Sequence, residues 1–128
     1  MGAFTAHPAI GGVAAERGGR LVGSNFLDER GPIRGVGPIT VDPAEQESGV
    51  GRRLMEAVLE RGREARGIRL LQDAFNSRSL ALYTSLGFDV RDPVAVLGGR
   101  PTREGATGAE VWPLREDDLE ACEELTLR

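Results

Sequence analysis

A glycine turn between an apolar run and an amphipathic segment constrains the fold of this chain more than any other feature. The apolar run ends at Val41, Gly49 and Gly51 follow, and apolar residues then recur at helical spacing over Ser48–Arg66. Backbone N–H groups at a helix start have no intrahelical partner, and the helix dipole favours an anion there. The turn therefore predicts a phosphate cradle; the alternative is a tight strand-to-helix turn that binds nothing.

The segments on either side of this turn predict a mixed α/β fold. Three apolar runs separated by glycine-containing turns predict an antiparallel meander, with strands at Ile10–Arg17, Arg20–Glu29 and Ile33–Val41. A further strand at Ile68–Phe75 follows the long helix, which implies a parallel pair. Pro38 cannot donate to a strand ladder, so it predicts a bulge or a gap in pairing, unless it is simply an edge proline.

A second motif lies further along the chain. Asn76–Phe88 reads as a short amphipathic helix that carries Tyr83, the only Tyr of the chain, and ends at Gly87. Beyond it we expect short strands at Phe88–Arg91 and Val94–Leu97, a loop at Gly98–Gly108, a strand at Glu110–Leu114 and an acidic helix at Arg115–Leu127.

Composition excludes several classes of function. The size of 128 residues is typical of one domain, and the net charge of -4 argues against nucleic acid as a partner. Every basic residue is Arg, which excludes a Schiff-base or P-loop lysine. Cys122 and His7 are single, so neither a disulfide nor a Cys/His zinc set can form within the chain. No apolar stretch approaches the ~20 residues of a membrane span, so we expect no membrane partner. We also expect a cytoplasmic protein that uses no metal.

The two motifs, taken in order, resemble the GNAT family of N-acetyltransferases. Gln46, Gly49 and Gly51 fill the family pattern Gln/Arg-x-x-Gly-x-Gly/Ala, and Asn76, Leu82-Tyr83 and Gly87-Phe88 follow at the family's distance. The resemblance implies a GNAT-like acyl-CoA N-acyltransferase fold, with a central mixed sheet and helices on both faces. It also implies acetyl-CoA as the acyl donor and an amine, small-molecule or peptide, as the acceptor.

The resemblance assigns roles to particular residues. It implies that coenzyme A contacts Val41, Gln46, Glu47, Ser48, Gly49, Val50, Gly51, Arg52 and Asn76. It makes Tyr83 the general acid toward the leaving thiolate, and a phenol with a pKa of about 10 is a donor at neutral pH. The alternative for Tyr83 is a half-buried side chain of an amphipathic helix.

Two departures from the family pattern support a different reading. Glu47 and Ser48 stand where the family commonly has Gly and a basic residue, so carboxylates crowd the cradle. No carboxylate lies within Ile33–Val41 to act as the base, and the nearest candidates are Asp28, Glu29 and Asp73, for each of which the alternative is a surface charge. His7, the single imidazole, is expected to be an exposed residue rather than a base. The alternative is a non-catalytic GNAT-like module with weak or no coenzyme A binding, acting in assembly or regulation.

The ends of the chain differ from a complete family domain. Such a domain opens with a strand and one or two helices, whereas this chain starts almost directly in the meander. Glu110–Glu120 resembles that opening at the other end of the chain. We therefore expect a GNAT-like core at 1–108, and at 109–128 either the start of a second unit or a swapped or permuted element. The uncovered sheet edge predicts a homodimer.

Overall fold

The computed structural model describes residues 6–99, 108 and 110–126. The chain divides into two compact units, Met1–Arg91 and Asp92–Arg128, and each is described by itself. Among the described residues, no helix has the length and apolar character needed to cross a bilayer.

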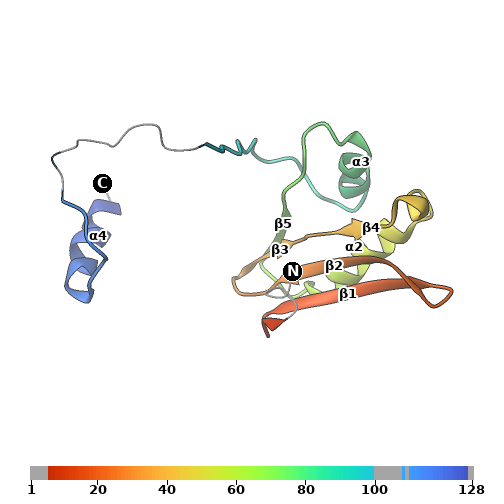
Figure 1. Ribbon diagram of the computed structural model, residues 1–128, viewed down its shortest axis with the longest axis horizontal. Coiled ribbons are helices and arrows are strands. Elements are labelled where there is room, and N and C mark those ends of the chain that lie inside the picture. Colours follow the sequence, from red (N-terminus) through yellow and green to blue (C-terminus); the bar gives the residue numbers. More distant parts are fainter. Residues whose placement is uncertain (1–5, 100–107, 109, 127–128) are drawn as a thin grey trace. The chain divides into compact units, whose positions relative to one another are not determined.

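The first unit is built on one mixed sheet (Figure 1). Its strands are β1 (Ile10–Arg17), β2 (Arg20–Asp28), β3 (Ile33–Val36), β4 (Thr40–Val41) and β5 (Gly67–Leu70), in the order β1-β2-β3-β5 with β4 also on β2. β3 and β5 are parallel, and the other pairs are antiparallel. The mixed α/β fold class and the parallel pair around the long helix are thus confirmed.

The predicted third strand is split in two, as expected from Pro38. Pairing of β3 with β5 ends at Val36 opposite Leu70, and the chain then turns at Gly37, whose φ is 121°. The Gly37–Pro38 peptide bond is cis. Within the described residues β4 pairs with β2 alone, so the sheet opens between β4 and the chain that follows β5. β5 stops at Leu70 rather than at Phe75 because β3 offers no partner beyond Val36.

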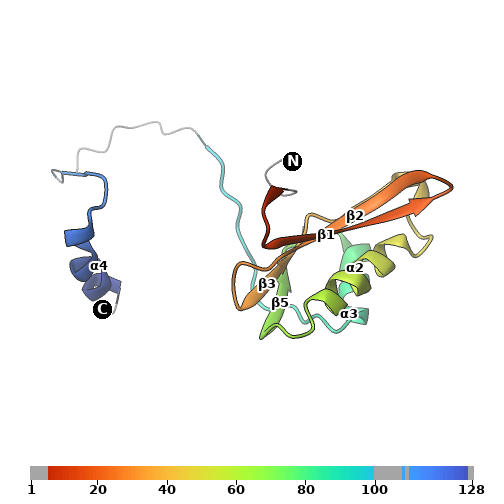
Figure 2. The ribbon, with the colours of Figure 1, turned by 90° about the horizontal axis from the view of Figure 1, so that it is seen from below.

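Two helices cover one face of this sheet, α2 (Val50–Arg61) and α3 (Ser77–Ser85) (Figure 2). Their core with β2 consists of the buried side chains Leu27, Met55, Val58 and Tyr83, and a second cluster joins Val22, Val50 and Leu54. A short 3-10 turn, η1 (Pro43–Glu45), precedes α2. The side chains of both helices therefore meet over β2.

α2 ends at Arg61, with Gly62 as its C-cap, and not near residue 66 as its periodicity predicts. A Cβ at Gly62 would lie 2.8 Å from Ile68 Cδ1 and 3.2 Å from Leu27 Cδ2. The glycine thus lets the end of the helix approach β5 closely, and the chain leaves the helix there.

One polar side chain lies in the core beneath α2. Asn25 is completely buried, and its Nδ2 donates to the Leu54 carbonyl at 3.3 Å and contacts Met55 Sδ at 3.4 Å. Its Oδ1 accepts from the Phe26 backbone N–H at 2.9 Å. The carboxamide thereby joins β2 to the middle of α2 and satisfies its own polar atoms.

The opposite face of the sheet carries small and apolar residues. Side chains alternate along a strand, so Phe26 points away from Leu27 and Ile33 points away from Val36. A Cβ at Gly12 would lie 3.1 Å from the Phe26 ring, and Ile33 is 42% exposed. Neither α2 nor α3 packs on this face.

Three predicted strands are wrong. Phe88–Arg91, Val94–Leu97 and Glu110–Leu114 form no strand, because none of them has a neighbouring strand among the described residues to satisfy its backbone. Their apolar side chains, including Val90, Val96 and Val111, are largely exposed. Most of the predicted loop at Gly98–Gly108 lies outside the described residues.

The helix predicted at the end of the chain is confirmed in the second unit. η2 (Glu116–Asp118) leads into α4 (Leu119–Thr126). The Asp118 carboxylate accepts from the Arg115 backbone N–H at 2.9 Å and from Trp112 Nε1 at 3.2 Å. The bond from the Arg115 N–H caps the helix start, and the bond from Trp112 holds the indole beside it.

Candidate functional site

The glycine turn presents an uncapped helix start. Gly49 is the N-cap of α2 with a φ of 84° and no side-chain cap, and a Cβ there would meet nothing within 4 Å. A Cβ at Gly51 would lie 3.8 Å from Val41 and from Leu82, which is ordinary contact. The first N–H groups of α2 therefore have room for an anion and no side chain that competes for them. This geometry fits the pyrophosphate of coenzyme A.

The two carboxylates at the turn are neutralised by arginines. Glu45 Oε2 lies 2.7 Å from Arg17 Nη1, and Glu47 Oε1 lies 2.9 Å from Arg78 Nη2. Arg78 Nη1 also reaches Gln46 Oε1 at 3.5 Å. Carboxylates are present at the turn as expected, but each is paired with an arginine from another element, Arg17 of β1 or Arg78 of α3.

The backbone at Glu47 is strained. Its φ is 75°, a left-handed conformation in which a Cβ is disfavoured and Gly is not. We expect Glu47→Gly to stabilise the fold by about 1 kcal/mol, net of the extra freedom of Gly in the unfolded chain. Glu47→Ala is the control, because it removes the carboxylate but keeps the Cβ. Urea denaturation measures both, and equal shifts for the two variants would contradict the backbone explanation.

Tyr83 lies in the core with its hydroxyl bonded to a neighbour on α3. It is 8% exposed, its ring meets Phe88 edge-on with centroids 6.2 Å apart, and its side chain hydrogen-bonds Ser79. Burial raises the pKa of the phenol, and the Ser79 bond opposes this only in part. Tyr83 is therefore protonated at neutral pH, as a proton donor must be.

The side chains of Asn76 and Ser48 both form hydrogen bonds with the nearby backbone. Asn76 is the N-cap of α3, and its Oδ1 accepts from the Ser79 N–H at 3.1 Å. Ser48 Oγ donates to the Glu45 carbonyl at 2.6 Å, which closes the turn before Gly49. Each residue thus shapes the start of a helix at the site.

The structure brings the two sequence motifs side by side. Arg52 Nη2 donates to Ser85 Oγ at 2.6 Å, and its Nη1 lies 3.8 Å from Glu56. Together with the bonds of Arg78 and the approach of Leu82 to Gly51, this contact joins the start of α2 to both ends of α3. These contacts bring the turn and the start of α2, with Val41, Gln46, Glu47, Ser48, Gly49, Val50, Gly51 and Arg52, against α3, the helix that Asn76 caps and that carries Tyr83.

Arg78 is a neighbour of the turn that the sequence motifs do not predict. Arg78 is the second residue of α3, and a cation in the first turn of a helix opposes the dipole. This electrostatically unfavourable position was the available sequence signal that Arg78 pairs with a carboxylate on another segment.

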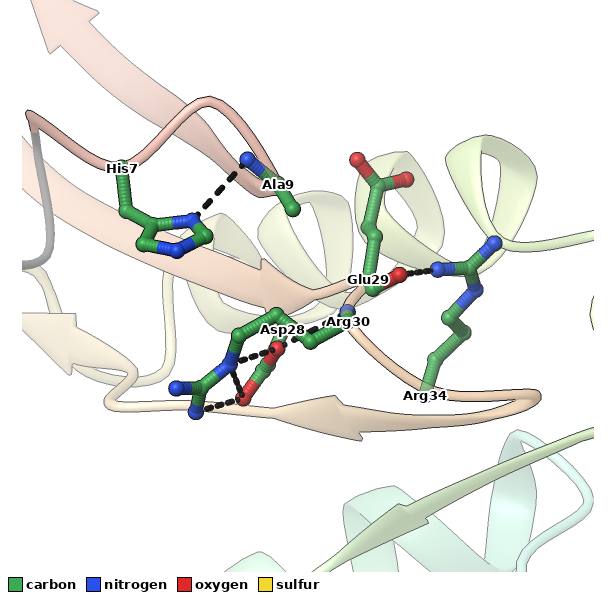
Figure 3. Close-up of polar contacts among 6 residues, drawn as sticks. All are labelled: His7, Ala9, Asp28, Glu29, Arg30 and Arg34. Carbon is green, nitrogen blue, oxygen red and sulfur yellow. Dashed lines mark hydrogen bonds and ion pairs between the residues drawn. The ribbon is translucent and has the colours of Figure 1, made fainter.

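Two candidate bases are paired with arginines, and Figure 3 shows one of these pairs, Asp28 with Arg30. Arg30 Nη2 lies 2.5 Å from Asp28 Oδ2, and its guanidinium lowers the pKa of Asp28 to about 2. Glu29 Oε2 lies 2.8 Å from Arg61 Nη2. An acid with so low a pKa accepts a proton poorly at neutral pH, so Asp28 is unsuited to be the base.

Asp28 gives a prediction of pH dependence. Because its folded pKa lies below the usual 3.8, the pair stabilises the fold above that value and is lost as the pH falls through about 2. We expect Arg30→Met to return the pKa of Asp28 toward 3.8, measured by carbon NMR of the carboxyl group. Arg34→Met is the control, since Arg34 donates to the Glu29 backbone carbonyl instead. An unchanged pKa in Arg30→Met would contradict this cause.

His7 and Asp73, the other residues considered as the base, make different local contacts. His7 Nδ1 accepts from the Ala9 N–H at 3.1 Å (Figure 3). At Asp73 the backbone carbonyl, and not the carboxylate, accepts from the Asn76 N–H at 3.0 Å. In the described part of the chain no three His, Cys, Asp or Glu side chains group as they would around a metal ion.

Comparison with known proteins gives the relatives of the chain. The sequence profile of the acetyltransferase (GNAT) family matches residues 2–88. The N-alpha-acetyltransferase RimI of Mycobacterium tuberculosis is 36% identical over 110 residues, which cover 82% of this chain and 65% of that protein. The mycothiol acetyltransferase of Thermobispora bispora is 39% identical over 83 residues, which cover 58% of this chain and 28% of that protein. The chain thus spans less than two thirds of either relative.

Solved structures share the fold. An alanine N-acetyltransferase of a ribosomal protein from Escherichia coli has a TM-score of 0.65 at 25% identity, covering 70% of this chain and 59% of that one. The aminoglycoside N-acetyltransferase AAC(6')-Iy in complex with CoA has a TM-score of 0.66 at 19% identity, covering 78% and 83%. With a family profile over more than half of its length and this shared architecture, the chain belongs to the acetyltransferase (GNAT) family.

Proposed function

We propose that this protein is an N-acetyltransferase that transfers an acetyl group from acetyl-CoA to an amine. The observation that carries the proposal is the uncapped glycine turn at Gly49, which lies beside the helix of Tyr83. The names of its relatives support the same class, and one fold neighbour is in complex with CoA.

Each group of the site has a task in this reaction. Bound acetyl-CoA would supply a thioester, whose acyl carbon gains a bond to the amine nitrogen and loses its bond to sulfur. The N–H groups of the turn at Gly49 and Gly51 would hold the pyrophosphate, and the opening beside β4 would take the pantetheine arm near Val41 and Asn76. Tyr83 would give its proton to the departing sulfur. The amine proton would leave to water.

A second candidate is a non-catalytic GNAT-like module with weak or no coenzyme A binding. The observation in its favour is that Asp28 and Glu29, two of the nearest carboxylates, are both paired with arginines. The glutamate at the strained position of the turn favours it as well.

We also propose that the protein is a cytoplasmic homodimer. The sheet face with Phe26 and Ile33 has no covering from α2 or α3, and a second copy would bury it. Residues 109–128 would be the start of a second GNAT-like unit, or an element exchanged between copies. Size-exclusion chromatography with light scattering measures the mass directly, and a monomeric mass would exclude the dimer.

Calorimetric titration with acetyl-CoA tests the proposed function. Micromolar binding is expected, followed by acetyl transfer when a peptide with an N-terminal alanine or an aminoglycoside is supplied as the amine. Gly49→Asp is the matched variant, because a carboxylate at the N-cap both fills the open space and repels phosphate. Absence of binding at millimolar donor would reject the enzyme and favour the non-catalytic module.

A further inference from the structure

Arg78 reaches from α3 to the glycine turn that starts α2. Its guanidinium lies 2.9 Å from Glu47 Oε1 and 3.5 Å from Gln46 Oε1, two successive residues of the turn. We propose that Arg78 is a binding residue for the donor, which exchanges the Glu47 carboxylate for the pyrophosphate of acetyl-CoA. This inference rests on the function proposed above.

The exchange is favoured by the exposure of the pair. The side chains of Arg78 and Glu47 are 64% and 72% exposed, and exposed ion pairs contribute little to stability. A guanidinium binds phosphate oxygens through two parallel hydrogen bonds, which are stronger than a single contact with an exposed carboxylate. Breaking the ion pair between Arg78 and Glu47 therefore costs little free energy.

The other arginines near the turn have different positions. Arg52 is bound to Ser85 and Glu56, and Arg17 is bound to Glu45. Arg53 lines the hollow between α2 and β1 with Val13 and Ala15, on the side of α2 away from α3. Among these arginines, Arg78 is thus the one that extends from α3 and pairs with Glu47 of the turn.

Glu47 then acts as a competitor for Arg78 that is built into the turn. An anionic ligand must displace the carboxylate, so removal of the Glu47 charge should tighten binding through Arg78. Direct repulsion between Glu47 and phosphate would also tighten binding, but it would do so whether or not Arg78 were present. The two causes are separable by a double-variant cycle.

The test measures acetyl-CoA affinity by calorimetry in Arg78→Met, Glu47→Gln and the double variant. We expect Arg78→Met to weaken binding about tenfold, as loss of a charge-assisted contact does. Glu47→Gln should tighten binding about threefold in the wild-type background and not at all in Arg78→Met. Arg63→Met is the matched control, because Arg63 is 66% exposed and pairs with Glu60 and Glu64 at the other end of α2.

Acetyl-dephospho-CoA, which keeps the pyrophosphate and lacks the 3′-phosphate, identifies the phosphate involved. If Arg78→Met loses affinity equally for both donors, Arg78 binds the pyrophosphate. If it loses affinity for acetyl-CoA alone, Arg78 binds the 3′-phosphate, and the pyrophosphate assignment is overturned. Arg78→Gln repeats the measurement if Arg78→Met does not fold.

The remaining outcomes separate this inference from the proposed function. Unchanged affinity in Arg78→Met, with a wild type that binds, overturns the role of Arg78 and leaves the proposed function intact. Tightening by Glu47→Gln in both backgrounds overturns the competition. A wild type that binds no donor rejects both proposals.

Discussion

Tyr83→Phe is expected to lower acetyl-transfer turnover by about 10²- to 10³-fold, with the acetyl-CoA affinity changed by less than about twofold. Phe keeps the ring that packs in the core and removes only the hydroxyl. Burial raises the pKa of that hydroxyl, so it remains protonated across the neutral range and turnover should hold at alkaline pH until Tyr83 ionises. Steady-state rates with titrated donor affinity give both quantities.

Ser79→Ala controls for the hydrogen bond of the hydroxyl. It removes the Ser79 partner and leaves the phenol in place, so a general-acid role predicts a much smaller loss of turnover than in Tyr83→Phe. If Tyr83→Phe lost affinity and turnover in equal measure, Tyr83 would be a structural residue. Retention of full turnover would move the proton donor elsewhere.

Leu27→Ala is expected to destabilise the fold by about 2–5 kcal/mol. Leu27 is fully buried on β2 and joins Met55, Val58 and Tyr83 in the core, so truncation leaves a cavity among all four side chains. Urea denaturation followed by circular dichroism measures the free energy of unfolding.

Leu21→Ala is the matched control for this prediction. It makes the same change on the same strand, but Leu21 is 64% exposed, and a surface truncation should cost less than about 0.5 kcal/mol. Similar losses in the two variants would mean that α2 and α3 do not pack on β2 in solution.

Most of the first unit could be predicted from sequence because its signals are local. Glycine pairs mark the turn between the first two strands, and the break at Pro38 marks where the third strand splits. Gly87, with a φ of 92°, ends the second motif as expected. These features depend on backbone conformations that the residue type itself restricts.

The errors in the fold concern features set by distant contacts. The end of α2 depends on the approach of Gly62 to Ile68, which helical periodicity does not encode. The alternating apolar residues of Phe88–Leu97 and Glu110–Leu114 match a strand pattern, yet a strand also requires a neighbour. A sequence pattern alone does not supply that neighbour.

The candidate site also contains both features that the sequence predicts and features that depend on the folded structure. The uncapped Gly49 was predictable, since a glycine before helical spacing leaves the first N–H groups free. The pairing of Glu47 with Arg78 was not, because it joins two segments through tertiary packing. The sequence also did not show that Asp28 is unsuited to be the base. Its partner Arg30 is only two residues away, but the pairing depends on side-chain geometry.

The buried carboxamide of Asn25 has a consequence for how accurately α2 is placed. Sliding the helix along β2 by one residue would move the Leu54 carbonyl away and leave Asn25 Nδ2 without an acceptor, at a cost of about 1–3 kcal/mol. Purely apolar contacts would tolerate such a slip far better. Asn25 thus selects one longitudinal position of α2, and that position determines where the helix presents its first N–H groups relative to β4.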